Sequence, residues 1–497
     1  MFDFEKLSAS KFYAAPHVER VVEFSPPGID MQNISKVLSL AVEATVTGAS
    51  AADGYADVSG RTSFRLTYLD REREPKGVDY NADFTVRAEG EFDAADNVSA
   101  TITVTESDVE AAGSLKLSAV LDVTVCAIRR EELNVLVSAE GCYQQTKEVY
   151  LPTFIASKTT VSPFDGEQEV GGEVTAVLSM NTSCIVRRSE AVEGGVKAAA
   201  TVVSTVTYVE GGEIKQRDFA IDMEEELGLD GVEPTDAVHI DACVKNSKIV
   251  LQGVTDDNVI RLEGEAQLRV RVFRCAKTSV ADGLFALRNE VQITRETANY
   301  VCFDGCGYFT EKVGGTALLG DNRAAAIAIN ALPYARCNTS KAYVGQDGKL
   351  NVEGIVNTDI IYTDENGYNS VRTEIPFTLA IDSEKPLSEQ IDVRCAVQNI
   401  SATVRREREI NIDITLAICV CGSSPLTFDY ISAVELGEEK QQNRSGVSLY
   451  IARGGDALLD LCKAFTAMPD DILAQNPTLE FPLSEGTRAI YFRQLAD

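Results

Sequence analysis

The sequence contains no tryptophan and only two histidines, His17 and His239, among its 497 residues. The histidines lie in unrelated sequence settings, so a Ser-His-Asp or Cys-His catalytic arrangement is not expected. A phosphate-binding loop of the form GxxxxGKS or GxxxxGKT is also missing, which removes the usual signature of nucleotide hydrolysis. A catalytic pair of carboxylates remains an alternative among the 76 acidic residues, although no position stands out. We therefore expect a protein that is not an enzyme and has neither catalytic residues nor cofactors.

Basic residues are scarce relative to acidic ones: 46 Lys and Arg compare with 76 Asp and Glu, and the formal net charge is −30. Nucleic acids and anionic membranes require basic patches, so neither is an expected partner. No run approaches the roughly 18 apolar residues of a membrane-spanning helix. The first residues also lack the basic and then apolar segments of a signal peptide. We therefore expect a cytoplasmic protein without membrane insertion.

Closely spaced cysteines are few among the twelve in the chain. Cys302 and Cys306 in CFDGC are one close pair, and Cys419 and Cys421 in CVC are the other. Neither pair has the CxxC spacing of a zinc ribbon. Other cysteines, such as Cys126, lie in long alternating segments, where a thiol behaves as a small core side chain. The pattern favours reduced, mostly buried thiols and no metal site.

One pattern occurs three times along the chain. A β-branched segment ends near Tyr68 in LTYLD, Tyr208 in VTYVE and Tyr362 in IIYTD. The copies are roughly 140–150 residues apart, which is the size of a domain. A phenylalanine follows each tyrosine, before a long segment of alternating apolar and polar residues: Phe84, Phe219 and Phe377. Such alternation is typical of a strand with one buried face, and we expect these aromatic residues to lie in the core.

The repeats divide the chain into an N-terminal extension and three modules, with predicted bounds 1–24, 25–150, 151–293 and 294–438. In each module, turn-prone stretches such as VGQDGK join the first strands into hairpins. One long alternating segment follows later in every copy, over 115–125, 260–270 and 410–420. The predicted fold is therefore mainly β, with three tandem all-β modules, each a sandwich or an open barrel of short antiparallel strands.

The pattern changes after a polar linker at 439–446, because apolar residues in the segment 447–497 follow a helical period. We expect a short strand, then a helix with Asp456 as its N-cap and four residues on its apolar face: Leu458, Leu461, Cys462 and Phe465. A second helix is expected to begin at Pro469 and to end near Asn476, before a final strand at 489–492. The predicted order is βααβ, a small α+β domain.

This C-terminal segment resembles a LysM domain at positions spread over most of its length: Tyr450, Gly455, Asp456, Leu458, Leu461, Phe465, Ile472, Leu473, Asn476, Pro477, Leu483 and Gly486. Ala457 departs from the family, which usually has threonine there. The resemblance implies a shallow groove for peptidoglycan or a chitin-like glycan containing N-acetylglucosamine. The ligand-binding residues that it implies are Gly455, Asp456, Ala457, Leu458, Asn476, Pro477 and Thr478. The alternative, which Ala457 and the missing tryptophan favour, is that Asp456 and Asn476 only cap helices.

The three modules resemble the SPOCS domains of clostridial spore-coat morphogenetic proteins. The features are the hairpin IVNTDIIYTDENG, the stretch EIPFTL and the closing segment before Glu435-Leu436, and they are clearest at about 330–438. In this family, SPOCS modules followed by a LysM domain imply a mother-cell protein at the forespore surface that binds the stage IV coat ATPase. The resemblance thus implies a non-enzymatic structural adaptor in spore envelope or coat assembly that binds coat-basement proteins. The alternative is a peptidoglycan-binding anchor that uses the LysM domain.

Overall fold

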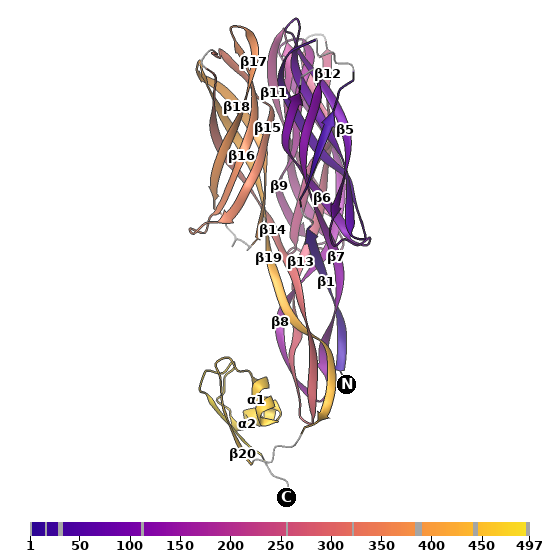
Figure 1. The fold of residues 1–497 in the computed structure, drawn as a ribbon, viewed down its shortest axis with the longest axis vertical. Coiled ribbons are helices and arrows are strands. Elements are labelled where there is room, and N and C mark those ends of the chain that lie inside the picture. The colour runs from indigo at the N-terminus through magenta and orange to yellow at the C-terminus, as the bar shows by residue number, and fades with distance from the viewer. Residues whose placement is uncertain are drawn as a thin grey trace.

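The computed structural model describes residues 2–14, 17–27, 33–110, 114–254, 257–320, 323–382, 390–440 and 446–493. The protein is mainly β, as the alternating sequence predicts. Figure 1 shows an elongated molecule in which three β lobes lie together at one end and long strands continue from them into a narrower stalk. A small domain with both helices lies beside the far end of the stalk.

Each lobe consists of two facing antiparallel sheets. In lobe 1 the first sheet has the order β3-β4-β5, with strands at Ile34–Ala52, Tyr55–Asp70 and Pro75–Glu89. In the second sheet β7 (Lys116–Ala139) pairs with three strands: β1 (Phe2–Ala14), β2 (Val18–Phe24) and β6 (Asn97–Glu110). Residues 1–24 were expected to be an extension, but β1 and β2 instead complete this sheet through their pairing with β7.

Lobes 2 and 3 repeat this strand order. The sheets of lobe 2 are β9-β10-β11 and β8-β13-β12, with β8 at Cys142–Val170, β9 at Val174–Val192, β10 at Gly195–Glu210, β11 at Glu213–Gly228, β12 at Ala237–Val254 and β13 at Asp257–Ala286. The sheets of lobe 3 are β15-β16-β17 and β14-β19-β18, with β14 at Asn289–Leu318, β15 at Ile327–Val344, β16 at Leu350–Asp364, β17 at Gly367–Ile381, β18 at Gln390–Arg406 and β19 at Glu409–Glu439.

The repeated aromatic residues lie in the cores between the facing sheets. Tyr208 and Tyr362 are fully buried, and Tyr68 is partly buried against the core of lobe 1. The repeated phenylalanines are buried too: Phe84, Phe219 and Phe377. The prediction of core positions is therefore confirmed for all but Tyr68, which is only half-buried. Inward-facing residues alternate along each strand, so the two sheets of a lobe bury one face each.

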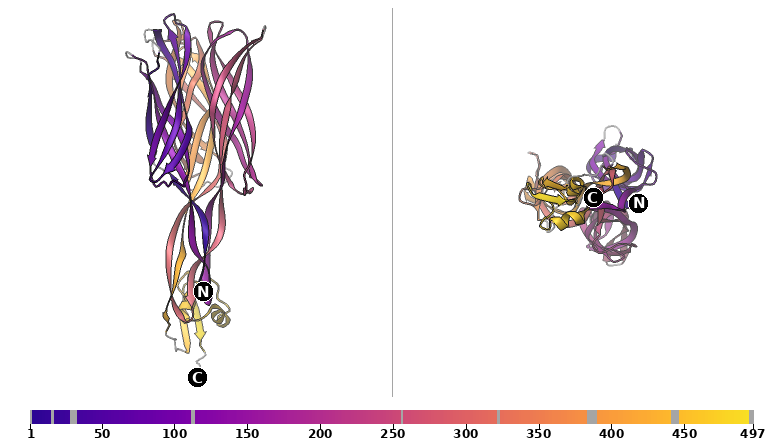
Figure 2. Two further views of the ribbon diagram at one scale, coloured as in Figure 1. Left: turned by 90° about the vertical axis from the view of Figure 1, so that its right-hand side faces the viewer. Right: turned by 90° about the horizontal axis from the view of Figure 1, so that it is seen from below.

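The stalk is formed by the same long strands after they leave the lobes (Figure 2). Strands β1, β7, β8, β13, β14 and β19 share one apolar core here: Ala9, Leu133, Val135, Val149, Leu151, Val280, Ala298, Tyr300, Phe428 and Tyr430. Turns at 140–141 and 287–288 join one lobe's last strand to the next lobe's first. The predicted boundaries at 150/151 and 293/294 therefore fall inside the continuous strands β8 and β14. Of the predicted linker 439–446, residues 441–445 lie outside the described part of the chain.

The three lobes contact one another directly. Their first sheets share a small apolar cluster: Leu38, Leu69, Leu178, Val209, Ile214 and Ile361. A second junction, polar in character, surrounds Asp241 of lobe 2. Arg271 donates to Asp241 at 2.8 Å and to Ser99 of lobe 1 at 3.1 Å, and Arg394 of lobe 3 also binds Asp241. Burial acts to raise the pKa of Asp241, but the charges of Arg271 and Arg394 outweigh it and hold the pKa below its usual value.

One ion pair recurs in the first two lobes, where it joins the loop before β6 or β12 to the long strand β7 or β13. In lobe 1 the guanidinium of Arg129 donates two hydrogen bonds of 2.8 Å to the buried carboxylate of Asp96. In lobe 2 Arg274 donates to buried Asp236 at 2.7 and 2.9 Å. In both, burial opposes ionisation of the carboxyl group, yet the hydrogen bonds from the arginine and a backbone N–H keep its pKa below the usual value.

Four of the twelve cysteines form disulfides, which corrects the expectation of reduced thiols. Cys275 on β13 is joined to Cys302 on β14, and Cys306 on β14 is joined to Cys421 on β19. Sequence spacing gave no sign of these pairs because each bond joins cysteines of different strands. Of the eight remaining cysteines, Cys462 is buried and seven are half-buried.

Candidate functional site

The C-terminal domain has the predicted order of strand, helix, helix and strand. Its elements are β20 (Val447–Ile451), α1 (Leu458–Phe465), α2 (Pro469–Gln475) and β21 (Arg488–Phe492), and β20 pairs with β21 in an antiparallel sheet. The apolar face predicted for the first helix is confirmed, because Leu461, Cys462 and Phe465 are buried and Leu458 is partly buried. Pro469 is at the first position of α2, as predicted.

Asp456 does not cap the first helix, contrary to the prediction. Ala457 is the N-cap residue, and its backbone N–H donates to Asp460 at 2.8 Å. Asp456 lies one residue earlier, where its carboxylate accepts hydrogen bonds from the Tyr450 hydroxyl at 2.7 Å and from the Arg453 N–H at 2.8 Å. These bonds lower the pKa of Asp456 and raise the pKa of Tyr450 to about 12. Asp456 therefore joins β20 to the loop that follows it.

Asn476 ends the second helix and also joins it to β21. Its side-chain amide donates at 2.8 Å to the carbonyl oxygens of Ile472 and Ile490, and its Oδ1 accepts from the N–H of Ile490 at 2.9 Å. Gln475 forms a matching pair of bonds with the backbone of Phe492. The polar atoms of the Asn476 side chain are thus engaged inside the domain.

The other residues implied as a glycan groove lie in two separate loops. Gly455 has a left-handed backbone with φ of 96° and donates its N–H to the Leu483 carbonyl, whereas Pro477 and Thr478 form the turn after α2. Gly455, Pro477 and Thr478 are exposed, while Ala457 and Leu458 are half-buried beside the first helix. The first loop is hydrogen-bonded to residues 483–487, and the second is attached through Asn476 to β21. Hydrogen bonds within the domain thus engage Gly455, Asp456 and Asn476 of these two loops.

The outer face of the two-stranded sheet is apolar and exposed. Alternate residues of β20 point outward, and in the register of the sheet Val447 lies opposite Phe492 and Leu449 lies opposite Ile490. We call this surface the apolar face; its members, with their exposed fractions, are Val447 (59%), Leu449 (59%), Ile451 (61%), Ile490 (40%) and Phe492 (58%). A contiguous exposed apolar surface of this kind is typical of a protein-binding site. The sequence predicted a short strand here, and the alternation of Val447, Leu449 and Ile451 places these three residues on one face of it.

The opposite side of the domain packs on the tip of the stalk (Figure 1). Phe285 of β13 is buried in the core of the C-terminal domain together with Leu459 of α1. A Cβ atom added at Gly283 would lie 2.3 Å from the Leu459 side chain, so the helix and the strand approach closely here. The ammonium group of Lys440 lies 4.3 Å from the centre of the Phe285 ring and donates to the Ala286 carbonyl at 2.8 Å. These contacts leave the apolar face directed away from the helices.

Comparison with known proteins gives one family match. The family model described as SipL, SPOCS domain, matches residues 335–405. This segment contains all of β16 and β17 and most of β15 and β18. These are four of the six strands of lobe 3. The match supports a SPOCS domain in lobe 3 and is consistent with a protein of sporulation. No curated protein matches the chain, and no solved structure matches it.

Among the described residues, neither helix approaches the length and apolar content required to cross a membrane.

Proposed function

We propose that this chain is a non-enzymatic structural adaptor in spore-coat assembly, and that its C-terminal domain is a LysM domain that docks a coat-basement protein. The SPOCS match at 335–405 supports the link to sporulation, and the βααβ order of 447–493 supports the LysM assignment. The observation that carries the docking role is the apolar face, because five large exposed apolar side chains on one small sheet are costly unless a partner covers them.

A protein partner fits the C-terminal domain better than a glycan does. Protein–protein association is stabilised when a contiguous apolar surface is removed from water. The polar side chains that a glycan would use are already engaged, since Asp456 binds Tyr450 and Asn476 binds the backbone of Ile472 and Ile490. We therefore propose that the partner is a spore-coat morphogenetic protein, with the stage IV coat ATPase as the candidate implied by the resemblance.

In this proposal the three lobes are tandem SPOCS-like modules that form the rigid body of the adaptor. Phe285 at the tip of the stalk packs into the core of the C-terminal domain, and the lobes lie at the other end of the stalk. An adaptor of this shape would act in the cytoplasm of the mother cell, where one end contacts the basement protein at the forespore surface and the lobes contact further coat proteins.

A binding titration with purified stage IV coat ATPase tests the docking role. The full chain with Leu449→Asp and Ile490→Asp places two charges on the apolar face, and we expect affinity to fall at least about a hundredfold, since two central interface residues commonly contribute about 2 kcal/mol each. The matched control is Leu318→Asp, a still more exposed leucine (71%) at the end of β14 that should leave affinity unchanged. Equal affinity of the double variant and the wild type would overturn the proposal.

Sedimentation with purified peptidoglycan tests the alternative, a glycan-binding anchor. Thr478→Glu changes an exposed residue of the implied groove without removing a folding hydrogen bond. We expect little retention of either the wild type or this variant. Strong retention of the wild type that Thr478→Glu abolishes and the Leu449→Asp/Ile490→Asp variant preserves would favour the anchor instead.

A further inference from the structure

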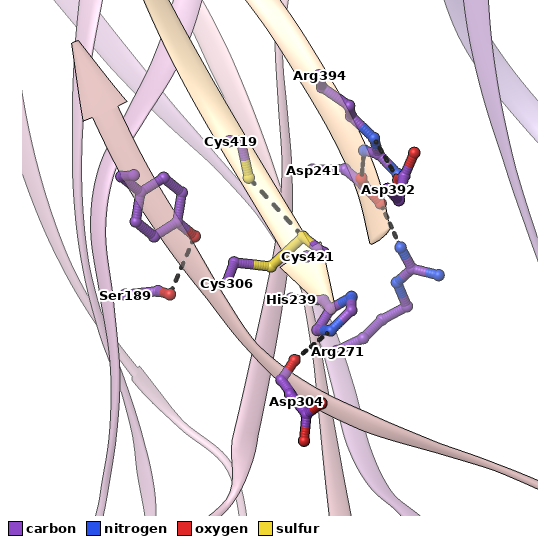
Figure 3. Close-up of a disulfide and its surroundings, with 11 residues drawn as sticks. Ser189, His239, Asp241, Arg271, Asp304, Cys306, Asp392, Arg394, Cys419 and Cys421 are labelled. Carbon is purple, nitrogen blue, oxygen red and sulfur yellow. Dashed lines mark hydrogen bonds and ion pairs between the residues drawn. A yellow bond between two sulfur atoms is a disulfide. The ribbon is translucent and has the colours of Figure 1, made fainter. Parts of the chain in front are cut away.

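Three side chains able to bind a metal ion lie together, and a fourth, Cys419, adjoins one of them (Figure 3). Cys306 on β14 and Cys421 on β19 are opposite each other in the strand register and form a disulfide. Their sulfur atoms and a ring nitrogen of His239 on β12 all lie within 4.8 Å of one another. The three residues are far apart in sequence, and lobes 2 and 3 bring them together.

A third thiol adjoins this group. The sulfur of Cys419 lies 3.8 Å from the sulfur of Cys421, on the same face of β19. Tetrahedral zinc with Zn–S bonds of about 2.3 Å holds neighbouring sulfur atoms about 3.8 Å apart, so this separation is that of two ligands of one ion. Three cysteines and one histidine form a common ligand set of structural zinc sites.

The imidazole of His239 is already held in place. Its Nε2 lies 3.1 Å from the carbonyl oxygen of Asp304, which assigns the ring hydrogen to Nε2 and leaves the lone pair on Nδ1. The rings of Phe273 and Phe303 pack edge-on against the imidazole, with centroids 5.4 and 5.2 Å away. A backbone acceptor for the second ring nitrogen and an apolar surround are the usual supports of a metal-binding histidine.

We propose that the Cys306–Cys421 disulfide is reducible and that the reduced chain binds one Zn²⁺ through Cys306, Cys419, Cys421 and His239. A dithiol reductant supplies two electrons and two protons, the S–S bond breaks, and the reductant leaves as its own disulfide. Zn²⁺ then displaces the three thiol protons into solvent, and the Nδ1 lone pair supplies the fourth bond. The site carries one net negative charge, and the guanidinium of Arg394, the strand partner of Cys419, is shared with Asp241 and Asp392.

The metal would connect parts of the molecule that the disulfide does not. The disulfide joins two strands of lobe 3, whereas the proposed site adds His239 of lobe 2. In the oxidised chain the Cys306–Cys421 disulfide lies within lobe 3, and the Cys275–Cys302 disulfide joins lobe 2 to lobe 3. In the reduced, metal-bound chain the metal would supply the connection between lobes 2 and 3 through His239.

Titration of the full chain with Co²⁺ under anaerobic conditions tests the site, because cobalt reports both sulfur ligation and geometry in its absorption spectrum. After reduction with a phosphine we expect one equivalent of Co²⁺ to give thiolate charge-transfer bands and the intense visible bands of tetrahedral coordination. The same chain with the disulfide intact should give neither. Added Zn²⁺ should displace the cobalt and remove the bands.

Variants assign the ligands. Cys306→Ser and Cys421→Ser should abolish the bands, Cys419→Ser should weaken the charge-transfer bands, and His239→Gln should lower the affinity at least about tenfold. His239→Gln keeps every thiol, so it remains informative if a serine variant misfolds in circular dichroism. Cys142→Ser at the stalk tip and the Cys275→Ser/Cys302→Ser double variant are controls that should bind normally. Absence of the bands in the reduced wild type, their persistence in Cys421→Ser, or their loss in either control would overturn the proposal.

Discussion

Exposed apolar residues are distributed differently in the three lobes and stalk, which we call the body, and in the C-terminal domain. In the body, large exposed apolar side chains are scattered over separate strands, as with Val21 on β2, Val137 on β7 and Ile327 on β15. In the C-terminal domain, five such side chains share the outer face of one two-stranded sheet. Scattered exposure is normal for a folded protein, whereas a shared face indicates a partner. The comparison therefore supports the proposal that the small domain is the docking part of the chain.

Removal of the largest side chain in the core of α1 should have the largest effect on stability. Phe465 is buried against Tyr450 and Tyr491, so Phe465→Ala is expected to destabilise the C-terminal domain by about 3–5 kcal/mol. Limited proteolysis should then cut within 447–493 while the lobes stay resistant. Phe428→Ala, in the stalk core, is the counterpart and should destabilise the body. Equal loss of resistance in the lobes and the C-terminal domain of Phe465→Ala would show that the two regions are one cooperative unit.

Loss of the recurring ion pairs of the body should have the second-largest effect on stability. Asp96→Asn and Asp236→Asn each weaken two hydrogen bonds to an arginine, and we expect each to lower the free energy of unfolding by about 1.5–3 kcal/mol. Denaturant titration measures the change. Asp83→Asn is the matched control, because Asp83 pairs with Arg61 on the exposed surface, where an ion pair contributes little to stability. A larger loss in the control than in either buried variant would refute this account.

The same two carboxylates give the body a pH dependence. Their pKa values are lower in the folded than in the unfolded chain, so the unfolded chain binds protons first as the pH falls. The stabilisation is complete above the unfolded pKa, near 3.8, and is lost as the pH passes through the folded pKa. We expect the melting temperature of the wild type to fall more steeply in acid than that of the Asp96→Asn/Asp236→Asn variant. Parallel curves for the two proteins would contradict the prediction.

The smallest effect is expected at the loop that carried the glycan prediction. Tyr450→Phe removes the hydrogen bond to Asp456 and should destabilise the C-terminal domain by about 1 kcal/mol. Hydrogen exchange of the Arg453 and Asp456 amides should rise, while the exposed control Tyr150→Phe on the stalk should leave these amides unchanged. If Tyr450→Phe leaves the exchange of these amides unchanged, the bond to Tyr450 does not hold Asp456 in place. Asp456 would then again be a candidate ligand-binding residue.

Local patterns in the sequence were sufficient to predict local structure. Alternation predicted the strands around Leu117 and Ile412, and the helical period predicted the buried face of Leu461 and Phe465. These predictions succeed because the period of apolar residues reports which face of an element is buried. The N-cap was misplaced by one residue: Ala457 is the N-cap, and the Asp456 carboxylate binds the Tyr450 hydroxyl and the Arg453 N–H instead.

The sequence did not predict which strands and side chains far apart in the chain come together. Nothing in residues 1–24 indicates that β1 and β2 pair with β7, about a hundred residues or more later in the chain. The meeting of His239 with Cys306 and Cys421 depends on how lobes 2 and 3 pack, which no spacing within one segment records. The apolar face could have been identified from Val447, Leu449 and Ile451, although its partner side chains on β21 depend on the register of the sheet.

Hydrogen–deuterium exchange of the full chain, with and without the stage IV coat ATPase, tests the division between body and docking domain most directly. We expect protection on binding to be concentrated in β20 and β21 and to be unchanged in the lobes. Protection that appears on the lobes while β20 and β21 exchange as in the free chain would contradict the assignment of recognition to the apolar face.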